Sequence, residues 1–256
     1  MVAGVRPDLL APERHRNRLQ DNRRVFAGGS SGNARHVTRR RLLRLASAAA
    51  ALPLSGPLRA VRASTVAQRD LGFRVMRHGS AIGEHRVTFR PDGNRLIIET
   101  RLQIAVKVLF FTAFRFAHEA EEVWRSDRLV SVTSTTDDNG TMRQVSGHAV
   151  ADGFRITGED GPFLASGHLL TSNALWDSRI VRQTRLIDVQ HGGEIGLVTK
   201  QLGDEDVDTP QGPLRASRHH MITPYYAGSV FHDRDGRWVK SVLELRGEHV
   251  EYALTT

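Results

Sequence analysis

The clearest pattern in the sequence is an alternation of apolar and polar residues with a period of two. It is longest over residues 96–108, where every even position is apolar or threonine and most odd positions are polar. Residues 71–75 and 249–254 show the same alternation over shorter stretches. Successive side chains of a β-strand point to opposite faces, so the pattern predicts strands with one face on a core and the other in water. This division is typical of antiparallel sheets.

Turn-forming residues separate these stretches at intervals typical of meanders. Asn-Gly and Asp-Gly supply the positive φ angles that tight hairpins require. No long amphipathic helix is indicated, and a short helical turn is expected only within residues 168–176. We therefore predict an all-β fold, an antiparallel, strongly curved sheet or open barrel or half-barrel of roughly ten to twelve strands. The turn signals are Pro91-Asp92-Gly93-Asn94, Asp138-Asn139-Gly140, Asp152-Gly153, Asp160-Gly161-Pro162, Gly192-Gly193, Asp235-Gly236 and Arg246-Gly247.

The most apolar segment of this region is residues 109–116, with the sequence LFFTAFRF. A continuous apolar run of this length is typical of a central strand that is buried on both faces. The same run also fits the wall of a lipid-sized cavity, because small barrels can enclose a ligand. The sequence leaves both interpretations open.

One face of the next stretch carries the candidates for a ligand pocket. On a strand all even positions from 114 to 124 share a face, which places His118 and Glu122 beside Trp124. Four residues of a strand span about 13 Å, so His118 and Glu122 cannot bind one metal ion, although His-Glu at first suggests a zinc-protease motif. The simpler interpretation is a strand whose polar residues pair with neighbouring strands. The pocket candidates are Phe114, Phe116, His118, Glu122 and Trp124.

The other polar clusters predict loops rather than reactive sites. The acidic run at residues 204–208 lacks the glycine and the final glutamate of a calcium-binding loop, so we expect a solvated loop. Residues 232–236 indicate a hairpin tip, and His219 and His220 would point to opposite faces of a strand. There is no phosphate-binding loop and no dinucleotide fingerprint in the sequence, so we expect no cofactor and no metal.

The net charge of +8 comes entirely from the N-terminal quarter of the chain. Residues 1–63 hold 13 arginines and three acidic residues, whereas residues 64–256 hold 23 basic and 25 acidic residues. A nucleic-acid-binding domain needs positive charge clustered on its folded surface, so we expect no nucleic-acid partner. The chain has no cysteine, which excludes disulfides, thiolate nucleophiles and iron–sulfur clusters.

The basic segment has the parts of an export signal in the right order. Residues 38–44 (TRRRLLR) contain the twin arginines Arg39 and Arg40 and resemble the twin-arginine (Tat) signal, which implies the Tat translocase as a partner during export. The apolar stretch at 45–54 is too short to span a membrane, which needs about 20 residues, but it fits a signal h-region. A basic amphipathic helix on the protein surface is the alternative.

Small residues after the apolar stretch indicate a cleavage site. We expect cleavage after Ala63, with Ala60 as the second choice, and no stable membrane span afterwards. The chain then has three parts. We expect residues 1–37 to be a disordered extension, or to be absent from the protein because the start codon is assigned too early. Residues 38–63 are expected to be the Tat signal peptide, and residues 64–256 a single antiparallel β domain.

Several short motifs are spread over residues 70–254. They are His118-Glu119, Glu122-Val123-Trp124, Leu129-Val130-Ser131, Trp176, Leu202-Gly203, Gly212, Phe231-His232-Asp233, Trp238-Val239 and Glu251-Tyr252-Ala253-Leu254. Together they resemble a bacterial family of exported proteins, domain-of-unknown-function family 6134. That family carries Trp-Tyr-Asp in place of residues 231–233, so this chain departs from its pattern there. The resemblance implies a fold but no reaction, and we also expect a likeness to periplasmic lipoprotein carriers of the half-barrel type.

These observations favour a periplasmic or secreted, non-enzymatic β-protein that binds a hydrophobic or amphipathic ligand or a partner in the cell envelope. The apolar run at 109–116 and the absence of a recognisable catalytic constellation carry this expectation. A hydrolase-like enzyme is the first alternative, and it would use His118 with Glu122, or His232 with Asp233. A structural envelope module is the second.

Overall fold

The computed structural model describes residues 69–108 and 111–256. This part of the chain forms strands and two 3₁₀ helices, η2 (Ala174–Trp176) and η3 (Ser178–Arg182). The strands are β1 (Leu71–Arg77), β2 (Ser80–Asp92), β3 (Arg95–Val108), β4 (Phe111–Arg125), β5 (Arg128–Asp138), β6 (Thr141–Val150), β7 (Gly153–Gly158), β8 (Gly161–Ala165), β9 (Arg185–Ile187), β10 (Glu194–Gly196), β11 (Val198–Thr209), β12 (Gly212–Ile222), β13 (Ala227–Asp233), β14 (Trp238–Leu245) and β15 (Glu248–Leu254).

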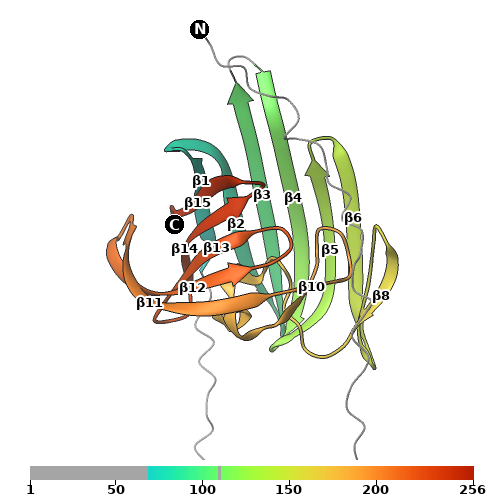
Figure 1. The fold of residues 1–256 in the computed structure, drawn as a ribbon. Helices are drawn as coiled ribbons and strands as arrows, with labels where there is room; N and C mark the ends of the chain where they lie inside the picture. The colour runs from blue at the N-terminus through green and yellow to red at the C-terminus, as the bar shows by residue number, and fades with distance from the viewer. Residues whose placement is uncertain (1–68, 109–110) are drawn as a thin grey trace, which may run out of the picture. The chain divides into compact units, whose positions relative to one another are not determined.

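Thirteen of these strands form one curved antiparallel sheet, in the order β11-β12-β13-β14-β15-β1-β2-β3-β4-β5-β6-β7-β8 (Figure 1). The first and last strands pair with each other, and β8 and β11 remain as two free edges, so the sheet is not closed. The small β9–β10 hairpin stands apart from it. The predicted all-β, open and strongly curved sheet is thus confirmed, with one strand more than the upper end of the expected range.

The alternation in the sequence maps directly onto the two faces of the sheet. In β3 the even-numbered Ile98 and Thr100 are buried, whereas the odd-numbered Glu99 and Arg101 are exposed. Cross-strand pairs share a face, so the register also sets which side chains lie level with one another.

One inward-facing row of side chains runs across four strands and contains two histidines. Its members are His85, Leu102, His118 and Thr136 from β2 to β5, which pair in turn.

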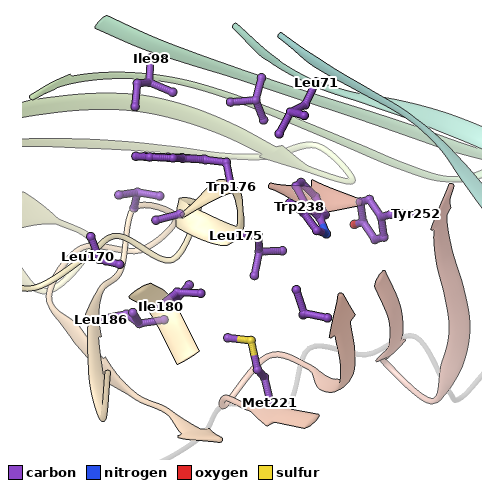
Figure 2. Close-up of a cluster of buried hydrophobic side chains, with 14 of the residues drawn as sticks. Leu71, Ile98, Leu170, Leu175, Trp176, Ile180, Leu186, Met221, Trp238 and Tyr252 are labelled. Carbon is purple, nitrogen blue, oxygen red and sulfur yellow. The ribbon is translucent and has the colours of Figure 1, made fainter. Parts of the chain in front are cut away.

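The concave face of the sheet is covered by residues 166–197, which we call the inner segment. This segment contains η2, η3 and the β9–β10 hairpin. Figure 2 shows its apolar side chains between strands that carry Ile98 and Leu71 and others that carry Met221, Trp238 and Tyr252. Buried members of the segment include Leu170, Leu175, Trp176, Ile180 and Leu186.

Aromatic packing holds the inner segment against the sheet. The Trp176 ring meets Trp124 edge-on, at 5.8 Å between ring centres and 88°, and meets Phe89 at 5.5 Å and 79°. Edge-to-face pairs of this kind contribute about 0.5–1.5 kcal/mol beyond the area they bury. The expected short helical turn is η2, which ends at Trp176.

The apolar run at 109–116 is not buried on both faces where the structure describes it. Thr112, Ala113 and Arg115 are exposed, and Phe114 and Phe116 are half-buried. Pairing between β4 and β5 ends at Phe116, so the earlier part of β4 has only β3 beside it, and both strands extend past their neighbours (Figure 1). The prediction of a doubly buried strand is therefore wrong for this part.

The acidic run at 204–208 is also not a loop. It lies in the edge strand β11, where Glu205 and Asp206 pair with Arg218 and Arg215 of β12. Charged side chains on a free edge discourage pairing with another chain, which is a common use of such residues. The predicted hairpin tip at 232–236 is confirmed in the sense that β13 ends at Asp233 and β14 begins at Trp238, although His232 itself belongs to the strand.

Two glycines allow the inner segment to contact β7 backbone to backbone. Gly192 has φ +86°, and a Cβ placed on it would lie 2.6 Å from Cα of Gly158. A Cβ on Gly158 would in turn meet the carbonyl oxygen of His191, which accepts a hydrogen bond from the Glu159 amide (2.8 Å). Neither position leaves space for a side chain.

Within the described residues, no helix has both the length and the apolar character needed to cross a membrane.

The substitution Gly192→Ala tests this close approach. It forces a methyl group into the backbone of β7 and strains a positive φ, so we expect the free energy of unfolding to fall by about 3 kcal/mol in urea denaturation. Gly193→Ala is the matched control, because Gly193 has φ +97° but open space around its Cβ. We expect it to cost only about 1 kcal/mol. Equal losses in the two variants would contradict the argument.

Candidate functional site

The five sequence candidates all lie on the inward face of β4, but the structure divides them into two groups. Trp124 is 2% exposed and Glu122 is fully buried, and both lie under the inner segment. His118 is 1% exposed. Phe114 and Phe116 lie further along the strand and remain half-buried.

Glu122 is a buried carboxyl group held by two donors. Thr171 Oγ1 donates to Oε1 (2.7 Å), and Trp124 Nε1 donates to Oε2 (2.9 Å). Burial raises the pKa of Glu122 to about 7, and the two hydrogen bonds partly oppose that rise. The group therefore fastens the inner segment to β4.

His118 makes an equivalent attachment two rows away. The side-chain amide of Asn173 donates to Nε2 (2.9 Å), which leaves the proton on Nδ1 to donate to Thr136 Oγ1 (2.8 Å). Burial lowers the pKa of His118 to about 4, so the ring is neutral at physiological pH. Ser134 Oγ adds a third contact by donating to the carbonyl oxygen of Val189.

His85 of β2 is the buried histidine that the sequence interpretation missed. Its ring packs against Trp238 (5.2 Å), Tyr252 (5.7 Å) and Phe73 (6.2 Å), and neither ring nitrogen has a hydrogen-bond partner in the protein. Burial, with a smaller contribution from His118, lowers the pKa of His85 to about 3. The alternation of His85 with the apolar Val87 is the sequence signal that could have identified it as inward-facing.

From Leu102 onward in β3, and up to Phe116 in β4, the inward face is apolar and only partly covered. We call this set the apolar end of the sheet. Arg246, from the β14–β15 turn, lies over the Phe114 ring (5.2 Å to its centre) and pairs with Asp138 (2.6 Å). The members of the apolar end are Leu102, Ile104, Val106, Phe114 and Phe116, of which Ile104 is buried and the others are half-buried.

His232 and Asp233 lie on β13, far from β4 in the strand order. His232 is 3% exposed, and its Nε2 donates to the carbonyl oxygen of Leu175 in the inner segment (2.8 Å). No direct contact joins it to His118 or Glu122 among the described hydrogen bonds. The two candidate pairs thus lie on separate walls. His232 contacts the inner segment, whereas Asp233 accepts hydrogen bonds from the Asp235 and Arg237 amides of its own turn.

A second acidic centre was not anticipated from the sequence. Asp188 accepts hydrogen bonds from Tyr225 OH (2.6 Å), His191 Nδ1 (3.1 Å) and the Gln190 amide (2.8 Å). Burial alone would raise the pKa of Asp188, but these bonds together hold it below its usual value. Tyr225 belongs to the β12–β13 turn, so the cluster ties that turn to the inner segment.

The structure also has a hollow of about 750 Å³ on the outer face of β2 to β7. Exposed hydroxyl, amide and charged side chains line it, such as Thr133, Gln144 and Glu121. A smaller hollow of about 250 Å³ lies beside Trp176 and Asp177. Asp177 is already bound by Arg179 in a bidentate pair, so its carboxylate is not available to a ligand.

Across residues 69–108 and 111–256, no three His, Asp or Glu side chains are grouped as metal ligands would be. The buried Glu122, His118 and His232 each bond to the chain's own inner segment. The export residues Arg39 and Arg40 and the cleavage residue Ala63 lie outside the described residues.

Fold and inner face together define an open, β-barrel-like protein. A solved structure of the same kind is the β-barrel-like protein of domain of unknown function DUF1849 from Brucella abortus, with a TM-score of 0.57 and 8% identity. The likeness covers 73% of this chain and 95% of that one, and it concerns the fold alone. The family model for the domain of unknown function DUF6134 matches residues 73–255, so the chain belongs to that family, as the resemblance implied. No curated protein matches the chain.

Replacing Glu122 by glutamine tests the buried carboxyl group. Because the pKa of Glu122 is higher in the folded than in the unfolded state, its contribution to the free energy of unfolding is largest below about pH 4.5 and falls as the pH rises to about 7. Relative to the wild type, Glu122→Gln should be more stable at pH 8 than at pH 4.5 by on the order of 3 kcal/mol, measured by urea denaturation. Glu121→Gln, on the exposed face, should show no such change. A pH-independent difference for Glu122→Gln would refute the assignment.

Proposed function

We propose that this protein is exported and binds a hydrophobic or amphipathic small molecule at the apolar end of its sheet. The supporting observation is the partial exposure of four inward-facing apolar side chains, Leu102, Val106, Phe114 and Phe116. Ile98 and Trp124, which lie under the inner segment, are by contrast buried. Burying one side chain of this size is worth about 1.5–3 kcal/mol, so a ligand that covers this end gains a substantial driving force.

The contacts of the inner segment support a division of the five sequence candidates. Thr171 and Trp124 already occupy both oxygens of Glu122, and Trp176 lies against Trp124. Phe114 and Phe116 are therefore the residues that contact the ligand in this proposal, and His118 lies at the base of the proposed site. Glu122 and Trp124 support the inner segment instead of contacting the ligand.

A structural envelope module is the second candidate, and the inner segment favours it. The segment fills the concave face with buried side chains such as Leu175 and Ile180, and it is fastened by Asn173 and Thr171. A filled interior gives the protein rigidity with no need for a ligand. A ligand-binding measurement distinguishes the two candidates.

The full-length chain should bind N-phenyl-1-naphthylamine, a neutral apolar fluorophore whose emission rises when it leaves water. Phe116→Asp should raise the dissociation constant about tenfold or more, because a carboxylate would replace a contact ring. Phe163→Asp is the matched control, since Phe163 is 43% exposed on the edge strand β8. Its dissociation constant should equal that of the wild type. If the wild type shows no saturable binding, the structural module is the better candidate.

Cell fractionation tests the proposed export. In a bacterium with a Tat system, the wild type should be found in the periplasm with a mass that lacks residues 1–63, because the twin arginines are the recognised element. Changing Arg39 and Arg40 together to lysine should keep the full-length protein in the cytoplasm. Arg59→Lys is the control and should leave export unchanged. A wild-type protein that stays in the cytoplasm uncleaved would contradict both the location and the signal.

A further inference from the structure

We propose that the ligand carries a neutral hydroxyl or carbonyl head group, which hydrogen-bonds to His85 and Thr100 on the inward face. This inference rests on the proposed function and adds the chemical class of the ligand. It comes from polar atoms that the protein buries without giving them partners, and from the charges of the buried side chains.

His85 and Thr100 are neighbours on adjoining strands. Val87 pairs with Thr100 and His85 pairs with Leu102, so His85 and Thr100 lie diagonally on the same face, with Cα atoms about 7–8 Å apart. Both are more than nine-tenths buried, at 7% and 3% exposed. Neither ring nitrogen of His85 nor Oγ1 of Thr100 has a hydrogen-bond partner in the protein.

Such orphaned polar atoms are costly to a fold. A buried donor or acceptor without a partner costs about 1–3 kcal/mol, and most buried polar groups are satisfied for that reason. Glu122 and His118, a short distance away on the same face, have every polar side-chain atom bonded. Tyr226 Oη and His232 Nδ1 are also buried without a partner, but His85 lacks one at both ring nitrogens and has Thr100 as a second unpaired group beside it. This pairing of unpaired groups points to a partner other than the chain's own side chains.

The surroundings of His85 suit an apolar molecule with a small polar head. Three rings, those of Phe73, Trp238 and Tyr252, pack around the imidazole. Leu102, its cross-strand partner, is a member of the apolar end. A ligand whose head reaches His85 would therefore leave its tail along the half-buried side chains of β3 and β4.

The buried charges exclude an anionic head at this position. Among the residues that the structure describes, the buried charged side chains are acidic, and no lysine or arginine is buried. The carboxyl groups of Glu122, Asp177 and Asp188 are each bound by protein donors, so no free anion awaits a cationic head either. A carboxylate or phosphate placed beside His85 would be an uncompensated buried charge.

One cation that could receive an anionic head lies at the edge of the apolar end. Arg246 lies over Phe114, but its guanidinium is already paired with Asp138 at 2.6 Å. A tail-first ligand with its head at Arg246 would also press an alkyl end against the unpaired nitrogens of His85. The head-inward arrangement satisfies those nitrogens instead.

Three ligands with one tail and different heads test the inference: 1-decanol, decanoate and decane. Each would compete with N-phenyl-1-naphthylamine for the full-length wild type at pH 8, where decanoate is ionised. We expect 1-decanol to bind about tenfold or more tightly than either decanoate or decane, because only its hydroxyl finds the buried partners. Thr100→Val and His85→Leu should each remove the preference for 1-decanol over decane and leave decane binding within about twofold.

His148→Leu, on the exposed part of β6, is the matched control and should keep the preference. Because Thr100→Val preserves side-chain shape, it tests the site even if His85→Leu fails to fold. Decanoate binding as tightly as 1-decanol, or weakening on Arg246→Gln, would overturn the head-inward arrangement while the proposed function stands. A preference that survives both Thr100→Val and His85→Leu would also overturn it. If neither the fluorophore nor any decyl compound binds, the proposed function fails as well.

Discussion

A curved sheet that does not close must cover its concave face with something, and here the chain uses residues 166–197. The two free edges, β8 and β11, leave the sheet without the continuous hydrogen bonding that stabilises a closed barrel. The inner segment supplies the missing contacts across the interior. The carbonyl oxygen of Leu175 accepts a hydrogen bond from His232 on one wall, and Asn173 donates one to His118 on the opposite wall. The burial of His118, Glu122 and Trp124 follows from this arrangement.

The inner segment is attached to the sheet by hydrogen bonds between buried polar side chains, at positions that are apolar in most protein cores. Glu122, His118 and Asp188 are buried and each is bonded on both available sides, which keeps their desolvation cost tolerable. Such contacts are directional, so they determine which residue of the segment meets which strand. Apolar packing, such as that of Trp176 on Trp124, then adds the stability. We regard the polar contacts as setting the register of the inner segment.

The half-buried apolar end and the unpaired polar atoms of His85 and Thr100 lie in the same region. Both depart from the rule that apolar side chains are packed and buried polar atoms are bonded. Elsewhere on the inward face, Ile98 and Trp124 are covered and the polar atoms of Glu122 and His118 are bonded, although Tyr226 Oη and His232 Nδ1 are also without a partner. Local violations of packing and hydrogen bonding are expected at functional sites, because stability is given up there for binding. The family itself supplies no activity to compare with, since both DUF6134 and the similar DUF1849 structure are described as domains of unknown function.

The sequence by itself determined the fold class and the facing of the strands. Alternation at 96–108 and the Asn-Gly and Asp-Gly turns were enough, because side-chain direction along a strand is a local property of the backbone. The same alternation predicts that His118 and Glu122 point inward, without any knowledge of tertiary contacts. The acidic run at 204–208 was misassigned to a loop because charge does not tell an edge strand from a turn.

Only the tertiary structure decided what those inward residues meet. Asn173 and Thr171 lie 55 and 49 positions away from His118 and Glu122, and nothing local in the sequence specifies contacts across such a separation. The same holds for the end of pairing at Phe116, which leaves part of an apolar run half-exposed. Burial depends on the length and placement of neighbouring strands, and these are set by the whole sheet rather than by any one segment.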